Sequence, residues 1–381
     1  MRAWLSSDKA RLSQVYFAYF TILGVISHYI GLYLHNLALQ PFMIGSALAV
    51  MTVGRIIGPT VWANIGFVSA EPKFRIQFGC LFTLLSFSLL LFNHHFIAIL
   101  IALGGFAFFW SAVLPQLETI CQNVLQGDAQ AYSRVRMWGS ISFIGFVIIA
   151  GWMFEIYGIV DSVEYMTVVL LVLLFISSFR LPPSPVQDEV DKPVSVFYIL
   201  KQKHIQVFFF CSFLLQLSFA SYYGFFSIYL TEEGYSGYQI GALISVGVVA
   251  EIIIFLLAGR ILAKFSLYQL FVFCLAITAV RWAALSWWGS ITAVLIVIQV
   301  IHAFSYGLYH VCSQKFIHAE FKGDTQAKGQ AWYLSFSYGL GGACGSLLAG
   351  ISWQYYYHQT YMFSAVIVMF SVLFAARYLR R

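Results

Sequence analysis

The sequence predicts an all-α membrane protein with twelve transmembrane helices in two six-helix bundles and with both termini in the cytoplasm. Three observations support this fold class. Hydrophobic residues make up 61% of the 381 residues and charged residues only 9%, whereas a water-soluble chain needs far more charge to cover its surface. The apolar runs are long and unbroken, and the lysines and arginines gather on one side of the resulting topology. This composition excludes disordered, collagen-like and nucleic-acid-binding chains.

The apolar runs define the helices in order. A helix needs about 20 apolar residues to cross a bilayer, whereas strands of a membrane barrel would alternate polar and apolar residues. The first run is longer than the apolar core of a signal peptide, so we interpret it as a transmembrane helix. The predicted spans are 13–37, 42–66, 75–93, 96–123, 136–158, 163–181, 206–230, 238–263, 267–288, 290–317, 329–353 and 358–377.

Basic residues fix the predicted orientation. With the N-terminus in the cytoplasm, all but two of the 21 lysines and arginines fall at cytoplasmic loops or tails. The exceptions, Arg55 and Arg281, lie within spans. The net charge of +6 therefore faces the anionic inner leaflet and does not require a nucleic-acid partner.

One polar segment divides the chain. Residues 183–204 are rich in proline and acidic residues, so they form a predicted cytoplasmic linker between an N-terminal bundle, 1–182, and a C-terminal bundle, 205–381. The halves are weakly similar: IGSALAVMTVGR (44–55) matches IGALISVGVVAE (240–251), and RVRMW (134–138) matches KGQAW (328–332). Parallel six-helix repeats with a mid-membrane site between them are typical of transporters.

Ionisable residues within the spans are the candidate functional groups, because a charge in the bilayer is costly unless it faces a cavity or a partner. Glu118 and Arg136 flank a short loop, so an ion pair between them is predicted. This pair either contacts substrate or is a structural salt bridge. Glu251 lies mid-span, where it either exchanges a proton or pairs permanently with an arginine. Arg281 stays charged, and Glu251 is its predicted counter-charge.

Further candidates line the same predicted pathway. Gln299, His302, Tyr306, Tyr309 and His310 recur at three- and four-residue spacing and build one polar helix face. Arg55 either binds an anionic substrate group or locks the two halves together. Three aromatic residues are further candidates, namely Trp138, Tyr222 and Tyr223. Each either stacks on a ring of the substrate or packs within the protein.

Together these motifs resemble one family. LLQLSFASYYGFFSIYL (214–230), SVGVVAEIIIF (245–255), AVRWA (279–283) and IQVIH (298–302) closely resemble the phenylpropionic acid permease family of the major facilitator superfamily. The resemblance extends to YFAYF (16–20), GRIIGP (54–59) and RVRMWGS (134–140), and so covers essentially the whole chain. It implies the twelve-helix fold of that superfamily.

The more distant lactose permease group is similar at matching points. That resemblance implies substrate binding for Glu118 and Arg136, and proton coupling for Glu251, Arg281 and His302. Three features depart from the pattern. Ser305 replaces an acid expected from the lactose permease group, and the acid at position 118 is glutamate where aspartate is expected in phenylpropionic acid permeases. The loop NIGFVSAEPKFRI (64–76) lacks the acidic-basic signature of the superfamily. The missing acid shifts the predicted proton route to Glu251.

The predicted function is proton-coupled uptake of a small organic solute by alternating access. An aromatic carboxylate of the phenylpropanoate type is the first choice of substrate, and a sugar or nucleoside is the alternative. The rival classes are a membrane-embedded enzyme or sensor and a channel, but the sequence has no HExxH, GxSxG or P-loop motif. We therefore expect no metal and no cofactor besides the proton gradient, and a monomer in a bacterial inner membrane.

Overall fold

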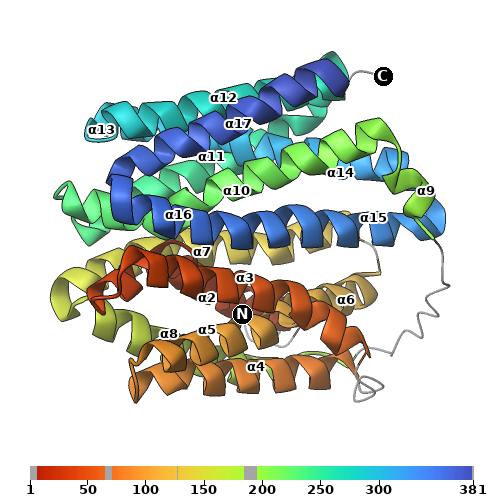
Figure 1. Ribbon diagram of the computed structural model, residues 1–381. Coiled ribbons are helices and arrows are strands. Elements are labelled where there is room, and N and C mark those ends of the chain that lie inside the picture. Colours follow the sequence, from red (N-terminus) through yellow and green to blue (C-terminus); the bar gives the residue numbers. More distant parts are fainter. Residues whose placement is uncertain (1–6, 65–70, 127, 184–194, 380–381) are drawn as a thin grey trace. The chain divides into compact units, whose positions relative to one another are not determined.

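The computed structural model describes residues 7–64, 71–126, 128–183 and 195–379, and its regular structure is entirely helical (Figure 1). The predicted all-α fold is therefore confirmed. The first half contains α2 (Asp8–Asn36), α3 (Pro41–Asn64), α4 (Pro72–Ser88), η2 (Leu89–Leu91), α5 (Phe96–Ser111), α6 (Val113–Leu125), α7 (Ala129–Tyr157) and α8 (Ile159–Ser178). The second half contains α9 (Phe197–Leu200), α10 (Lys203–Glu232), α11 (Gly237–Lys264), α12 (Leu267–Trp288), α13 (Thr292–His302), η3 (Ala303–Leu308), α14 (Tyr309–Glu320), η4 (Gly323–Thr325), α15 (Gln326–Trp332), η5 (Tyr333–Gly341), α16 (Gly342–Tyr356), η6 (Tyr357–Gln359) and α17 (Thr360–Tyr378).

Within the described residues, 11 helical stretches are long and apolar enough to cross a membrane. The last of these, Gln326–Tyr378, has 53 residues, whereas about 20 suffice for one crossing. Tyr357 interrupts it with a left-handed φ of 51°, and α16 and α17 continue as two separate helices (Figure 1). This stretch thus supplies two crossings, which brings the described helices to the predicted number.

The contacts divide the chain into two compact units. Unit 1 comprises Met1–Leu39, Val50–Glu189 and Ser236–Gly241, and in it α2 packs against α7 and α8. Unit 2 comprises Gln40–Ala49, Val190–Tyr235 and Ala242–Arg381, and in it α10 packs against α16 and α17. The helices α2 and α10, each the first of its half, are the most buried spans.

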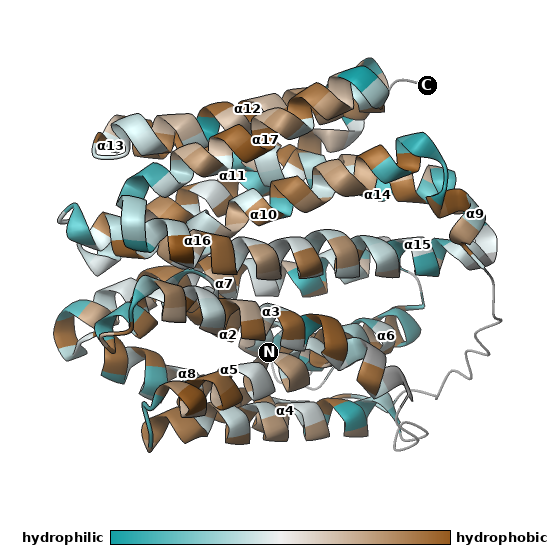
Figure 2. Ribbon diagram, in the orientation of Figure 1, coloured by the Kyte–Doolittle hydropathy of each residue, from teal (hydrophilic) through white to brown (hydrophobic). Residues whose placement is uncertain are grey.

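The predicted domain boundaries stay a prediction. Residues 184–194 of the predicted linker 183–204 lie outside the described residues, as do residues 65–70 of the loop 64–76. The cytoplasmic placement of the termini is likewise a prediction from the basic residues. Figure 2 shows hydrophobic residues along most of each helix and hydrophilic residues gathered mainly at helix ends and loops, the distribution expected for membrane spans.

Several spans are not simple α-helices. The predicted span 96–123 bends at Ala112, between α5 and α6, and the predicted span 290–317 contains the π-helix η3. A second π-helix, η5, lies between α15 and α16. A π-helix bonds residue i to i+5, so each of these segments rotates the residues that follow it relative to a regular α-helix.

Glycine permits the closest helix crossings in each unit. In unit 2, a Cβ on Gly45 of α3 would collide with the carbonyl of Ser346 on α16. In unit 1, a Cβ on Gly151 of α7 would collide with the carbonyl of Gly237 at the start of α11. Small residues let helix backbones approach in this way, which explains why these positions tolerate no side chain.

The helix α7 begins with an aspartate cap. The Asp128 carboxylate accepts hydrogen bonds from the backbone N–H of Ala131, at 3.1 Å, and of Gln130, at 3.0 Å. Donation from Ala131 N–H is the main reason that the pKa of Asp128 lies below its ordinary value. Because the cap fixes the first turn of the helix that carries Arg136, it orients a candidate site residue.

We expect Asp128→Ala to lower the thermal stability of the purified protein at pH 7, because it leaves N–H groups of the first turn without acceptors. Asp128→Asn should stay close to wild type. Since the folded pKa is lower than the unfolded one, the extra stability of the charged cap is present above the unfolded pKa. It is lost as the pH falls through the folded pKa. Equal losses for the alanine and asparagine variants in a melting series over pH would contradict this role.

Candidate functional site

The first polar cluster joins α6 to α7 in unit 1, and we call Glu118, Tyr132 and Arg136 the Glu118 cluster. Arg136 Nη1 donates to Glu118 Oε1, which is the predicted ion pair. The Tyr132 hydroxyl donates to Glu118 Oε2 at 2.8 Å and accepts from Arg136 Nη1 at 2.9 Å. The three side chains therefore form a closed ring of hydrogen bonds.

The α6–α7 turn brings the Glu118 cluster together. Gln126 ends α6 with a left-handed φ of 50°, and Asp128 starts α7 two residues later. Tyr132 and Arg136 are four residues apart on α7, so both face the same side. The Arg136 side chain is 47% exposed and that of Glu118 26%, so the cluster is accessible to a polar ligand.

Tyr132 was not among the residues that sequence reasoning selected. Its signal was its position four residues before Arg136, which places it on the same helix face. Trp138, two residues beyond Arg136, is 36% exposed and its ring lies 6.5 Å from that of Phe17. Arg55 is an exposed residue of α3. Substrate contact by Trp138 and Arg55 stays a prediction.

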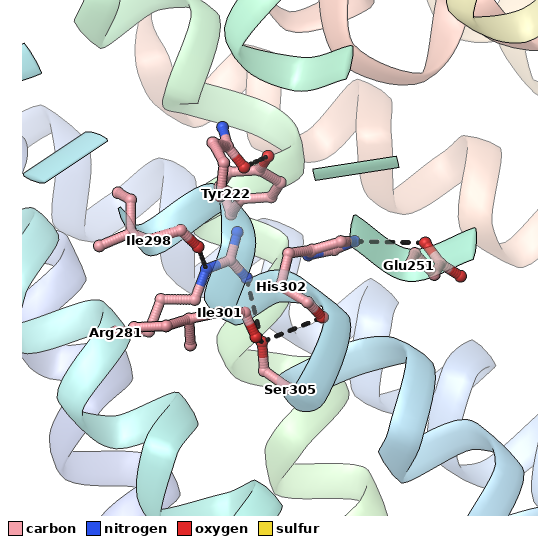
Figure 3. Close-up of polar contacts among 8 residues, drawn as sticks. Tyr222, Glu251, Arg281, Ile298, Ile301, His302 and Ser305 are labelled. Carbon is pink, nitrogen blue, oxygen red and sulfur yellow. Dashed lines mark hydrogen bonds and ion pairs between the residues drawn. The ribbon is translucent and has the colours of Figure 1, made fainter. Parts of the chain in front are cut away.

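The second polar cluster lies in unit 2, and we call Tyr222, Glu251, Arg281, Gln299, His302 and Ser305 the Arg281 cluster (Figure 3). Arg281, on α12, is fully buried. Its Nε donates to the carbonyl of Ile298 at 2.8 Å, and its Nη1 lies 3.5 Å from the Ser305 hydroxyl. Its guanidinium also packs on aromatic rings, with Cζ 4.4 Å from the Trp282 ring and 4.5 Å from that of Tyr222.

Glu251 and Arg281 do not form the direct ion pair that the sequence analysis expected. Glu251 Oε2 instead lies 3.7 Å from His302 Nε2, and none of the ion pairs found among the described residues includes Arg281. Figure 3 shows the reason: the His302 ring stands between the Glu251 carboxylate and the guanidinium. The two charges share a cluster without touching.

Tyr222 and Gln299 complete the Arg281 cluster. The Tyr222 hydroxyl donates to Gln299 Oε1 at 2.8 Å, and the Tyr222 ring stacks on His302 at 5.9 Å between centroids. Both side chains are buried. Tyr223 turns toward Phe219, whose ring lies 6.0 Å away. Contact of Tyr222, Tyr223 and Gln299 with substrate stays a prediction.

The predicted polar face of span 290–317 splits into two. The rings of His302, Tyr306 and His310 stack in one row, with centroids 5.4 Å and 6.4 Å apart. Tyr309 faces elsewhere, where its hydroxyl lies 2.7 Å from that of Ser212. The π-helix η3 explains the difference, because its wider turn aligns residues four apart and rotates Tyr309 away.

A third polar cluster went unpredicted in unit 1. Glu164 of α8 is buried, and its Oε1 accepts from the Tyr33 hydroxyl at 2.7 Å and lies 2.6 Å from His94 Nε2. Sequence analysis selected neither Glu164, Tyr33 nor His94 as a candidate site residue. These residues come from three segments that are far apart in the sequence, so no residue spacing predicts the contact.

The comparisons with known proteins agree with this architecture. The chain belongs to the MFS_1 like family, whose model matches residues 9–365. It is 26% identical over 365 residues to the "Probable 3-phenylpropionic acid transporter" of Escherichia coli (strain K12), covering 93% of each chain. It is 25% identical over 237 residues to the "Putative nucleoside transporter YegT" of the same organism, covering 58% of this chain and 55% of that one.

Among solved structures, the crystal structure of nucleoside transporter NupG superposes with a TM-score of 0.87 and 16% identity, over 98% of this chain and 100% of that one. This likeness shows the fold. Together with the family and the membrane helices, it makes the chain a multi-pass membrane transporter of the inner-membrane type rather than an enzyme. Transporters of this type generally need no cofactor, and the relatives act on small molecules.

We expect a double-mutant cycle on Glu118→Gln and Arg136→Gln to be non-additive. Each single change leaves the other charge without its partner, so the double variant should lose less free energy of unfolding than the two singles together. For a partly exposed pair the coupling should be about 0.5 kcal/mol. Chemical unfolding in detergent measures it, and Arg134→Gln, an exposed neighbour on the same helix, is the control. Additive losses would show that the pair contributes no coupling.

Proposed function

We propose that this transporter is a proton-coupled symporter that takes up a small organic solute by alternating access of its two halves. The observation that carries the proposal is the Glu251–His302 pair, a carboxylate and an imidazole 3.7 Å apart within apolar helices. A carboxylate held in such surroundings can exist in charged and neutral forms, and a histidine beside it can accept or return the proton. Glu251 is the proposed proton carrier, and Arg281 is the permanent charge that tunes it.

The proposed substrate is an aromatic carboxylate. The relative that matches over nearly its whole length is named for 3-phenylpropionic acid. Arginine binds carboxylates through paired hydrogen bonds, and aromatic rings pack against an aryl group. In this proposal the Glu118 cluster orients the substrate, assisted by Trp138 and Arg55, while Tyr222, Tyr223, Gln299 and Tyr306 supply aromatic and polar contacts.

A nucleoside is the second candidate substrate. The match to YegT and the structural likeness to NupG favour it, since both proteins are named as nucleoside transporters. A carboxylate–arginine pair such as Glu118 and Arg136 also suits hydroxyl groups, because it offers both acceptors and donors. We further propose that the proton gradient is the sole energy source and that the protein works as a monomer.

We expect Glu251→Gln to abolish accumulation against a gradient while leaving exchange of internal for external substrate intact. Glutamine keeps the shape of the side chain but carries no exchangeable proton. Uptake of labelled 3-phenylpropionate into proteoliposomes with an imposed pH gradient measures the first activity, and counterflow measures the second. Glu233→Gln, at an exposed glutamate, is the matched control. Undiminished accumulation by Glu251→Gln would refute the coupling role.

We also expect 3-phenylpropionate, rather than uridine or lactose, to raise the unfolding temperature of the purified protein. A ligand that binds only the folded state adds stability that grows with its concentration relative to Kd, reaching about 2.7 kcal/mol at one hundred times Kd. Thermal unfolding in detergent, followed by competition in proteoliposomes, measures this preference. Stabilisation by uridine without 3-phenylpropionate would favour the nucleoside reading.

A further inference from the structure

Arg281 carries a positive charge that none of its direct contacts balances. The side chain has no exposed surface, and its contacts are a backbone carbonyl, the hydroxyls of Ser305 and Tyr222, and aromatic faces. All of these partners are neutral. A buried charge with neutral partners is costly, because the low polarity around it neither solvates nor screens it.

Two hydrogen-bond donors in the Arg281 cluster are also unused. Arg281 Nη2 and Gln299 Nε2 are buried and have no hydrogen-bond partner within the described part of the chain. Tyr222 connects the two residues, since its ring lies under the guanidinium and its hydroxyl holds the amide oxygen of Gln299. Unused buried donors beside a positive charge are well suited to an acceptor that is negatively charged.

The charge count of the cluster depends on Glu251. When Glu251 is ionised, its negative charge balances Arg281 from the far side of His302. When the Glu251–His302 pair takes up a proton, the cluster gains one positive charge, whichever of the two residues holds it. One monovalent anion bound at Arg281 would restore the original balance.

We propose that Arg281 and Gln299 bind the carboxylate of the substrate, and that one proton on the Glu251–His302 pair and one organic anion enter together. The inference rests on the proposed function and narrows its substrate to a monovalent aryl carboxylate. An anion without the proton leaves the cluster negative, and a proton without the anion leaves it positive. Each therefore favours binding of the other, which couples their transport one to one.

The remaining groups around the cluster do not alter this count. Beside Glu251 and Arg281 stand tyrosine hydroxyls, which are neutral in the physiological range, and one further histidine lies in the ring stack beyond Tyr306. The titratable groups that face the two charges are Tyr222 and Tyr223 of α10, His302 of α13, Tyr306 of η3 and Tyr361 of α17. His310 of α14 and Tyr338 of η5 lie one residue further away, beside Tyr306.

The aromatic walls agree with the same substrate class. Phe219, Tyr222 and Trp282 surround the guanidinium, with ring centroids 4.4 to 5.7 Å from Cζ. These rings would pack against an aryl group whose carboxylate points at Arg281. An uncharged nucleoside would leave the positive charge unbalanced. Because the guanidinium is fully covered, the anion enters in a state in which this part of unit 2 opens.

The first test is the pH dependence of binding to the purified full-length protein. In the range where the Glu251–His302 pair releases its proton, the Kd for 3-phenylpropionate should rise about tenfold per pH unit. Glu251→Gln should bind with a Kd that is nearly independent of pH, and the uncharged 3-phenylpropanamide should not bind to the wild type. A pH-independent Kd in the wild type, or equal binding of the amide, would overturn the inference.

The second test supplies Arg281 with an internal counter-charge. Ser305 lies 3.5 Å from Arg281 Nη1, so Ser305→Asp should neutralise the guanidinium and weaken 3-phenylpropionate binding more than about tenfold. Ser305→Asn has the same size without the charge and should stay within about threefold of wild type. Arg281→Gln should also lose carboxylate binding, whereas Arg260→Gln, at an exposed arginine of α11, should not. Thermal unfolding establishes that each variant is folded.

The outcomes separate this inference from the proposed function. If the wild type accumulates 3-phenylpropionate with protons but Ser305→Asp and Ser305→Asn bind it equally, the anion site at Arg281 is wrong and the symporter stands. If Arg281→Gln keeps wild-type affinity, the same conclusion follows. If the wild type accumulates uridine but no carboxylate, both the proposed aromatic carboxylate substrate and the anion site at Arg281 are wrong. The effect of Glu251→Gln on accumulation then decides whether transport is proton-coupled.

Discussion

The energetic cost of a charge inside a hydrocarbon layer governs this protein. It removes charge from the spans, so that all but two of the 21 lysines and arginines fall near one predicted face. It also dictates what the remaining ionic side chains contact. Glu118 and Arg136 bond directly to each other, Glu251 stands beside His302, and Arg281 relies on a carbonyl and aromatic rings. Each arrangement reduces the cost by a different means.

The parts of the site that depend on local sequence were predictable. Glu118 and Arg136 are separated by one tight turn, so the α6–α7 hairpin fixes their depth and brings them together whatever the other helices do. The apolar runs likewise predicted the helices, because length and hydrophobicity alone decide whether a segment crosses a bilayer. The break at Ala112 was not predicted, although Pro115 marks it, because proline has no N–H to bond the carbonyl of Ser111 four residues earlier.

The parts that depend on helix rotation and long-range packing were not predictable. Glu251 was expected beside Arg281, but His302 of α13 lies between them. This arrangement depends on how α11, α12 and α13 are rotated about their axes, which the sequence does not reveal. The π-helix η3 shifts the register within span 290–317, so a regular 3.6-residue period misplaces Tyr309. The Glu164, Tyr33 and His94 contact joins three distant segments, and no pairwise spacing in the sequence encodes it.

The two ionic clusters differ in what a proton would do to them, and this difference supports a division of labour. In the Glu118 cluster, the carboxylate bonds directly to an arginine and a tyrosine, which suits a fixed set of donors and acceptors. In the Arg281 cluster, acid and arginine are held apart by His302, so a proton can enter without breaking an ion pair with the guanidinium. Because the acid and the arginine are not locked to each other, the cluster can exist with and without a bound proton. Coupling one solute to another requires at least two such states. We therefore propose that the first half of the chain offers the substrate a fixed set of polar contacts, while the second half binds its carboxylate and couples it to the proton.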